Sequence, residues 1–293
     1  MPELPEVQTT VNGLNKHIRG LTIVDVWTDY NSLFHKGKDS IKDPAYFRSF
    51  KKRIIGGKVR SASRLAKNVL IELQSGDVIL VHMKMTGHLM YGGYDRTDPF
   101  NRFIHLVFTF DNGKTLELSD MRKFAKVTLI NKDDLEKTVH LDHIGPDPLG
   151  KGFTPKVLKG RLEQRKNGRI KTVLMDQSVI AGVGNIYSDE ALWRTGLNPE
   201  ERVKDIPDRL FKKLYDDLRG VLEKGIDFGG DSMSDYRNID GKRGKFQGQH
   251  KVYRKTGEKC PKKGCHGIIL RKVVGGRSAH YCSEHQKLKK SKK

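Results

Sequence analysis

Residues 68–83 read NVLIELQSGDVILVHM, two apolar runs joined by the turn Ser75-Gly76-Asp77. Short runs rich in Val, Ile and Leu, bounded by turn residues, predict neighbouring β-strands over residues 68–73 and 77–83. Similar runs lie on both sides of this pair, at residues 21–27, 103–110, 115–118 and 126–130. Many short strands at this spacing predict a β-sandwich or flattened barrel in the first half of the chain.

Helical patterns flank the predicted strands. A short amphipathic helix is expected over residues 6–18, because apolar residues recur at helical spacing from Val7 to Ile18. Pro5 suits the first helical position, where its missing N–H costs nothing. Beyond the Gly- and Pro-containing stretch 144–150 the pattern becomes helical again.

The second half of the chain is therefore expected to be mainly helical. Helices are predicted over residues 171–180, 185–195 and 205–224, with Gly196 and Gly225 ending the last two. A Gly-rich loop then runs over residues 225–245, and a loop of this length more often has a function than not.

The charge of the chain is strongly positive and unevenly distributed. The 293 residues include 56 Lys and Arg against 35 Asp and Glu, a net charge of +21. Residues 242–293 hold 17 basic and 2 acidic residues, so +15 of this charge lies in them. The asymmetry indicates a polyanionic partner, DNA or RNA before a membrane surface. A solubilising basic tail is the alternative, which we assign to the final eight residues, 286–293, alone.

The sequence carries no sign of a membrane or secreted protein. It has no run of about 18 apolar residues and no apolar leader. Three cysteines in the chain argue against a disulfide scaffold and for a reducing compartment. We therefore expect a cytoplasmic protein without membrane association.

The three cysteines form a metal-ligand pattern together with a histidine. Cys260, Cys265, Cys282 and His285 are spaced C-x4-C and C-x2-H, with 16 residues between the pairs. Two ligand pairs joined by a strand-like linker predict a zinc ribbon, in which one closed four-ligand Zn²⁺ site is structural. His266 and His280 are alternatives for the fourth ligand, and unbound cysteines beside a surface histidine are the alternative to the site.

The N-terminus, MPELPEV, carries a nucleophile beside two acids. Removal of Met1 leaves Pro2 with a secondary amine, and an α-amino group titrates near roughly 7.7–8.0. Glu3 follows directly and Glu6 lies one helical turn later. An amine beside carboxylates can form a Schiff base with a masked aldehyde while the acids move its protons.

These motifs occur in one order that resembles the formamidopyrimidine-DNA glycosylase/endonuclease VIII family. The resemblance rests on PELPE at the N-terminus, the turn GVGN at residues 182–185, and GGRS at residues 275–278 before Cys282. It covers essentially the whole chain. Members of the family are base-excision repair enzymes that remove oxidised bases and then nick the strand. Leu4 resembles the formamidopyrimidine-DNA glycosylase branch, since the endonuclease VIII branch usually has glycine there.

The resemblance implies the catalytic residues. Pro2 would attack C1′ of the damaged nucleotide, and the resulting iminium would permit β- and then δ-elimination. Glu3 would be the general acid–base residue, and Glu6 would orient water or shuttle protons. Lys67 matches a lysine near the lesion phosphate and base. Outside the family, Glu3 and Glu6 would merely complement the helix dipole, and Lys67 would be an ordinary surface lysine.

A base extruded from duplex DNA leaves a gap that apolar wedges and flat cations fill. Met85, Arg122 and Phe124 match the family residues that fill it, with the arginine facing the orphaned base. Without the family, Met85 and Phe124 would be core residues. Lys123 stands where arginine is common, so a phosphate contact there would lack bidentate geometry.

The resemblance also implies contacts with DNA phosphates. Asn185, at the end of the turn 182–185, would contact a phosphate with help from Lys171. Small residues let backbone N–H groups approach the phosphate, and the start of a helix favours an anion. Arg277 in the ribbon and Tyr253 match two further phosphate contacts. Residues 229–236, GGDSMSDY, correspond to the loop that caps the lesion, and we call them the capping loop. Ser234 departs from the arginine that many members have there.

We therefore expect an α+β monomer that binds double-stranded DNA containing an oxidised base or an abasic site, in a bacterial-type cytoplasm at the nucleoid. The alternatives are an endonuclease VIII-like glycosylase for oxidised pyrimidines and a non-catalytic zinc-ribbon DNA-binding protein. The expected parts are a β-sandwich catalytic domain (1–140), a linker (141–157), a helix-two-turn-helix domain with the capping loop (158–247), a zinc-finger ribbon (248–286) and a basic tail (287–293).

Overall fold

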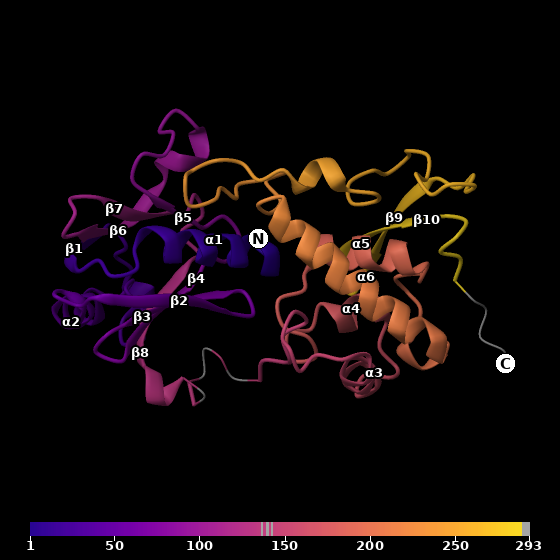
Figure 1. Ribbon diagram of the computed structural model, residues 1–293, viewed down its shortest axis with the longest axis horizontal. Helices are drawn as coiled ribbons and strands as arrows, with labels where there is room; N and C mark the ends of the chain where they lie inside the picture. Colours follow the sequence, from indigo (N-terminus) through magenta and orange to yellow (C-terminus); the bar gives the residue numbers. More distant parts are fainter. Residues whose placement is uncertain (136, 139–140, 142, 289–293) are drawn as a thin grey trace. The chain divides into compact units, whose positions relative to one another are not determined.

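The structure is a computed structural model that describes residues 1–135, 137–138, 141 and 143–288 (Figure 1). The chain forms two compact units, residues 1–142 with 225–247 and residues 143–224 with 248–293. The segment 225–247, which we expected in the helical domain, is thus grouped with the first unit. Residue 140, the predicted end of the first domain, and residues 289–293 of the predicted tail lie outside the described residues.

The first unit contains an antiparallel β-sandwich, as predicted. Its strands are β1 (Ile23–Thr28), β2 (Val59–Leu65), β3 (Asn68–Leu73), β4 (Asp77–His82), β5 (His88–Tyr91), β6 (Ile104–Phe110), β7 (Thr115–Ser119) and β8 (Lys126–Asn131). One sheet has the order β2-β3-β4-β8 and the other β1-β6-β7-β5 (Figure 1). β3 and β4 pair from Asn68 opposite His82 to Glu72 opposite Val78, around the turn that the sequence indicated.

One apolar core fills this sandwich. Every second residue of β3 from Val69 to Leu73, and of β6 from Leu106 to Phe110, belongs to it, as expected where successive side chains of a strand point to opposite faces. Helix α1 (Leu4–His17) packs on β2 and β3 and adds its predicted apolar face to the same core. This packing fixes the N-terminal end of the chain against the sandwich.

Several elements of the first unit were missed or misplaced. α1 begins at Leu4, so Pro5 occupies its second position and Glu3 is the N-cap. Helix α2 (Pro44–Ile54) was not predicted, although Asp43 caps it by accepting from the Ala45 amide at 2.7 Å. Strands β2 and β5 were also missed. β2 reads VRSASRL, which is too polar to stand out, and it forms because β3 supplies its pairing partner.

The second unit contains helices α3 (Pro155–Glu163), α4 (Ile170–Leu174), α5 (Asn185–Thr195) and most of α6 (Asp208–Asp227), with the hairpin β9 (Ile269–Val274) and β10 (Arg277–Cys282). α5 has the predicted bounds, and Gly196 ends it in the left-handed conformation at φ 84°. Short 3₁₀ helices complete the chain: η1 (Leu33–His35), η2 (Pro99–Arg102), η3 (Lys132–Asp134), η4 (Val203–Asp205) and η5 (Phe246–Gln249).

Several boundaries of the helical part were wrong. The helix predicted over residues 171–180 stops at Leu174, because Asp176 accepts from the Ser178 amide at 2.9 Å and starts a turn. α3 begins inside the predicted linker 141–157, with Thr154 as its cap. α6 begins at Asp208, three residues later than predicted, and continues through Gly225 to Asp227.

The predicted α+β class is confirmed: a β-sandwich, a helical region and a C-terminal Cys/His cluster are all present. Among the described residues no helix is both long enough and apolar enough to cross a membrane.

Candidate functional site

The first cluster of candidate residues lies at the N-terminus of α1, in the first unit. Pro2, Glu3 and Glu6 are all buried. The Glu6 carboxylate accepts a hydrogen bond from the Glu3 amide at 2.8 Å, within a capping box that begins the helix. The first helical turn therefore fixes the backbone that follows Pro2.

The same carboxylate also holds the capping loop. Its other oxygen accepts from the Asp231 amide at 2.7 Å, and the Tyr236 hydroxyl donates to the Glu6 carbonyl at 3.0 Å. Burial raises the pKa of Tyr236, so its hydroxyl keeps the proton that it donates. Glu6 is thus more than a charge beside the helix dipole, because it joins the N-terminus to a loop about 225 residues away.

The capping loop has a compact backbone with an exposed tip. Ser232 Oγ donates to the Tyr236 carbonyl at 2.7 Å and accepts from the Gly244 amide at 2.8 Å. A Cβ on Gly244 would lie 2.2 Å from the Gly230 carbonyl oxygen, so only glycine permits this approach. Met233 and Ser234 are exposed at the tip.

Lys67 lies between β2 and β3 among other cations. It is buried and follows Ala66, whose φ is 54°. Burial first, then the charges of Lys84, Lys67 and Lys126, lower the pKa of His82 to about 3, so His82 is neutral at physiological pH. His82, Lys84 and Lys126 line a cavity of about 770 Å³. The sequence prediction included Lys67 but missed these three residues.

Met85, Arg122 and Phe124 lie on two loops that a buried acid ties together. Asp120 accepts hydrogen bonds from the Thr86 hydroxyl, from the Arg122 amide at 3.3 Å and from the Ala125 amide at 2.7 Å. The Arg122 amide also donates to Thr86 Oγ1 at 3.1 Å. The loop after β4 and the loop after β7 are therefore fixed to each other, through two residues that the sequence prediction missed.

The wedge candidates are not core residues. Met85 is 42% exposed and Phe124 is 47% exposed, which contradicts the core interpretation of both. The Arg122 guanidinium stacks 4.4 Å from the centre of the Phe124 ring. Exposed large apolar side chains beside a cation form a surface suited to a partner. Lys123, the departure from arginine, pairs with Asp29 at 3.1 Å.

The second unit brings the turn 182–185 next to the ribbon hairpin. The Asn185 side chain donates to Ser278 Oγ at 3.2 Å, and Arg277 precedes that serine at the exposed start of β10. Gly275 packs so closely on α4 that a Cβ there would lie 2.2 Å from Thr172 Cγ2. Asn185 and Arg277, far apart in the sequence, thus belong to one surface.

Lys171, which was expected to help bind a phosphate, lies in the interior of the second unit. Its ammonium is fully buried and donates to Asp189 at 2.6 Å, to Ser188 Oγ at 2.9 Å and to the Asn185 carbonyl at 2.9 Å. An enclosed ammonium with these acceptors supports the turn from behind. We therefore interpret Lys171 as a residue that holds the backbone of Asn185 in place, and not as a direct phosphate contact.

Tyr253 is held by another buried acid of α5. The Glu190 carboxylate accepts from the amides of Lys251, Val252 and Tyr253 at 2.9 to 3.0 Å. The Tyr253 ring packs edge-on against His280, with ring centres 5.1 Å apart. Sequence reasoning missed Asp189 and Glu190, although adjacent acids within a helix of so basic a chain were a usable signal.

The four predicted metal ligands converge. The ligand atoms of Cys260, Cys265, Cys282 and His285 all lie within 4.8 Å of one another. Cys265 Sγ lies 3.5 Å from Cys282 Sγ and 3.7 Å from His285 Nδ1. Zn–S bonds of about 2.3 Å at tetrahedral angles place two sulfurs about 3.8 Å apart, so this set fits tetrahedral zinc.

The surroundings of the cluster select its fourth ligand. His285 Nε2 faces the Trp193 carbonyl at 3.1 Å, which directs Nδ1 to the sulfurs as an outer partner of a metal ligand does. His280 instead bonds Asp189 at 2.9 Å, and His266 is not in the cluster. His285 is therefore the histidine positioned to complete the set.

Comparisons with known proteins agree over both units. Residues 1–127 match the formamidopyrimidine-DNA glycosylase N-terminal domain, and residues 144–237 match the formamidopyrimidine-DNA glycosylase H2TH domain. The formamidopyrimidine-DNA glycosylase of Pelotomaculum thermopropionicum is 38% identical over 289 residues, which are 99% of this chain and 100% of that protein. That of Bacillus subtilis is 36% identical, over 98% of this chain and 99% of that protein.

Solved structures give the same answer. A Lactococcus lactis FPG mutant in complex with Fapy-dG containing DNA has a TM-score of 0.83 and 31% identity, covering 97% of this chain and 99% of that one. MutM in complex with carbocyclic 8-oxo-G containing DNA has a TM-score of 0.83 and 30% identity, with the same coverage. The chain therefore belongs to the formamidopyrimidine-DNA glycosylase family, a family of DNA-repair enzymes.

The buried Lys171–Asp189 pair gives a stability prediction. Lys171→Met should lower the free energy of unfolding of the second unit by about 3–5 kcal/mol, because it leaves Asp189 charged and buried. Lys212→Met is the matched control, since Lys212 pairs with Asp216 at 2.7 Å on the surface of α6 and should cost less than about 1 kcal/mol. Urea unfolding measures both, and equal costs would contradict the structural role of Lys171.

Proposed function

We propose that the chain is a bifunctional DNA glycosylase and abasic-site lyase of base-excision repair that removes oxidised purines from double-stranded DNA. The observation that carries this proposal is the arrangement at the start of α1. One buried carboxylate, Glu6, holds both the backbone behind Pro2 and the capping loop. Relatives solved with Fapy-dG, carbocyclic 8-oxo-G and abasic-site DNA support the class of substrate.

The proposed chemistry begins with loss of Met1, which frees the Pro2 nitrogen. That nitrogen attacks C1′, the bond from C1′ to the base breaks, and the base leaves. The bond from C1′ to O4′ then breaks and O4′ takes up a proton, which opens the sugar. The Pro2 nitrogen, which has lost its proton on attack, supplies the electron pair for the C=N bond, so the opened sugar is an iminium bound to Pro2. It acidifies the neighbouring sugar protons, so that β-elimination and then δ-elimination release the two phosphates. Glu3, buried beside Pro2, moves the protons in these steps.

The proposed role of Glu6 follows from its hydrogen bonds. Both of its oxygens accept backbone N–H groups, which holds the nucleophile's backbone and the capping loop in one geometry. Holding the reacting groups in one geometry lowers the barrier to the attack.

Recognition of damaged DNA is assigned to the exposed loops of the first unit. Met85 and Phe124 would fill the gap left by the extruded nucleotide, and the Arg122 guanidinium would hydrogen-bond the orphaned base and favour cytosine. Lys67, in its group of cations, would hold the phosphate of the lesion. The presence of all three loop side chains supports the purine branch over the pyrimidine branch, and their exposure makes each of them available to DNA.

The second unit would hold the DNA backbone. Asn185 and Arg277 lie on one surface and would bind phosphates, with Tyr253 as a further contact. Cys260, Cys265, Cys282 and His285 would hold one Zn²⁺, which supplies a structural cross-link and no chemistry. We propose that the protein acts as a monomer on its DNA.

Replacing the proline secondary amine by a primary amine should stop base excision. Pro2→Gly should reduce single-turnover excision of 8-oxoguanine by at least about 100-fold, because excision needs the secondary amine in place. An uncleaved residue ahead of Pro2 should have the same effect, since it converts the amine to an amide. Pro5→Ala, which keeps the amine, is the control. Excision that persists in the Pro2 variant would contradict the proposed nucleophile.

Arg122 should determine the opposite base. The unmodified chain should excise 8-oxoguanine and formamidopyrimidine opposite cytosine faster than thymine glycol. Arg122→Ala should lose most of the preference for cytosine over adenine, because it removes the hydrogen-bond donors to the orphaned base. Lys123→Ala is the neighbouring control and should keep the preference. A chain that prefers thymine glycol would instead support the pyrimidine alternative.

The metal cluster can be tested by metal content. The purified chain should carry one zinc, measured by mass spectrometry of the metal, and both Cys282→Ser and His285→Ala should lose it. His266→Ala should keep it. The two zinc-free variants should also bind DNA more weakly while the first unit stays folded, and unchanged DNA binding would contradict a role of the ribbon.

A further inference from the structure

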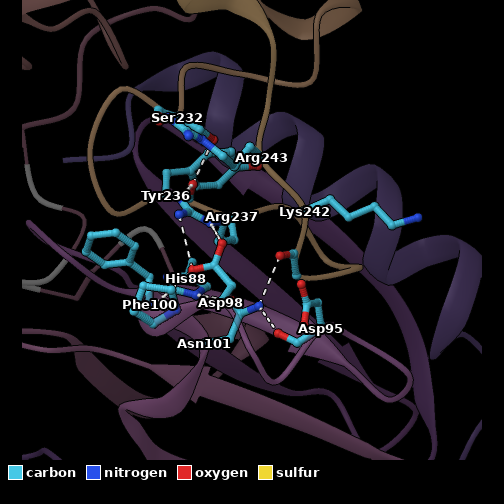
Figure 2. A network of polar contacts seen from close by, with 12 residues as sticks. His88, Asp95, Asp98, Phe100, Asn101, Ser232, Tyr236, Arg237, Lys242 and Arg243 are labelled. Atoms are coloured by element: carbon cyan, nitrogen blue, oxygen red, sulfur yellow. Dashed lines mark hydrogen bonds and ion pairs between the residues drawn. The ribbon is translucent and has the colours of Figure 1, made fainter.

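A polar network links the segment behind the capping loop to the segment between β5 and β6 (Figure 2). The first segment comprises residues 237–245 and the second residues 92–103, and both belong to the first unit. Arg237 is at the centre of the network, immediately after the capping loop. Asp98 and Asn101 lie in the second segment and contact the first.

The Arg237 guanidinium is almost completely enclosed. Its side chain is 4% exposed, and Nε and Nη2 donate to the two oxygens of Asp98 at 2.6 and 3.2 Å. Nη1 donates to the carbonyls of Ser234 and Tyr236 at 3.2 and 2.9 Å. The face of the guanidinium lies 4.8 Å from the centre of the Phe100 ring. The cation thus binds the backbone of the capping loop on one side and a carboxylate of the sandwich on the other.

Asp98 is itself held in place. It accepts from the Phe100 amide at 2.9 Å and so caps η2. Burial opposes its charge, but the hydrogen bonds from Arg237 and Phe100 hold the pKa of Asp98 below its usual value. Both members of the ion pair are therefore charged at neutral pH, and the bidentate geometry fixes their orientation as well as their distance.

A second set of contacts runs parallel to this pair. The Asn101 side chain donates to the Gly241 carbonyl at 3.1 Å, and its oxygen faces His88 Nε2 at 3.3 Å. The Tyr91 amide donates to the Ile239 carbonyl at 2.7 Å. Gly241 has a φ of 70°, and a Cβ there would lie 2.6 Å from the Cβ of Tyr94. The chain behind the capping loop is therefore docked along β5.

Between these anchors the capping loop has two fixed ends and an exposed tip. At the front, the Asp231 amide is bound to Glu6. At the back, the carbonyls of Ser234 and Tyr236 are bound to Arg237. Met233 lies between them and is exposed, and Ser234 is also exposed although its carbonyl is held. A loop that is held in this way is already ordered. It therefore loses little further conformational entropy when it covers a ligand.

We propose that the Arg237–Asp98 ion pair is a latch that fixes the conformation of the capping loop for the extruded base, which makes both residues positioning residues for base excision. The inference rests on the proposed function. An abasic site has no base to cap, so loss of the latch should slow excision and leave cleavage of a preformed abasic site unchanged. A general loss of folding would lower both activities together.

The test uses the full chain with Arg237→Gln and Asp98→Asn. Asp98→Asn keeps the size and one acceptor of the side chain, which guards against misfolding, and Arg237→Lys keeps the charge but not the bidentate fork. Arg96→Gln is the matched control, because Arg96 also pairs with an acid of the first unit, Glu117 at 3.5 Å, but is 76% exposed. Single-turnover excision of 8-oxoguanine, cleavage of abasic-site DNA and amide hydrogen exchange of residues 231–236 are measured for each.

We expect the rate of excision to fall about 10- to 100-fold in Arg237→Gln and in Asp98→Asn, because a small misplacement of a positioned group can cost about this factor. Abasic-site cleavage should stay within about twofold, with faster exchange at residues 231–236 and an intermediate effect for Arg237→Lys. Arg96→Gln should change none of these. Equal losses of excision and cleavage, or unchanged exchange, would overturn the latch. An unmodified chain that neither excises nor cleaves would refute the proposed function instead, and the exchange measurement would still decide whether the latch exists.

Discussion

The buried Glu6 carboxylate is the interaction on which the N-terminal site depends. Its two oxygens accept the amides of Glu3 and Asp231, so one side chain fixes both the start of the chain and the capping loop. A buried carboxylate is stable only when hydrogen bonds replace its lost water. The requirement is met here by two backbone groups, and this couples the location of Pro2 to the conformation of the loop that would cover its substrate.

Buried or nearly buried acids hold other segments of the molecule in the same way. Asp120 ties the wedge loops together, Glu190 holds residues 251–253, Asp189 joins Lys171 to His280, and Asp98 holds Arg237. Each of these acids is buried or nearly so, and each accepts backbone amides or pairs with a cation. A chain with a net charge of +21 therefore uses its few buried acids to hold the loops that present its exposed basic groups. This arrangement suits a partner that is itself a polyanion.

Sequence patterns predicted the elements that depend on local chemistry. Strand β3 and helix α5 have the predicted bounds, because an apolar run and a terminal glycine mark them directly. The metal ligands were predicted because thiolate spacing is a local property of the chain, although only the structure separates His285 from His280. β2 escaped prediction because its own sequence is polar and β3 supplies its pairing partner. The helix stop expected at Gly225 was wrong, because α6 continues to Asp227.

The contacts that organise the site were not predictable in the same way. Lys171, in α4, was expected at a phosphate. It is instead enclosed by Asp189 and Ser188, which belong to the next helix, α5. Arg237 and Asp98 are 139 positions apart, and nothing in either local sequence marks them as partners. Residue type and spacing thus identify which groups can do chemistry, whereas tertiary packing decides which groups hold them in place.

The most direct test of the central claim is to locate the covalent intermediate. The chain, with Met1 removed, is incubated with 8-oxoguanine DNA and borohydride, digested, and its peptides are sequenced by mass spectrometry. A reduced sugar remnant on the Pro2 nitrogen is the predicted result. A remnant on Lys67 or another lysine, or no adduct although the lesion is removed, would contradict it.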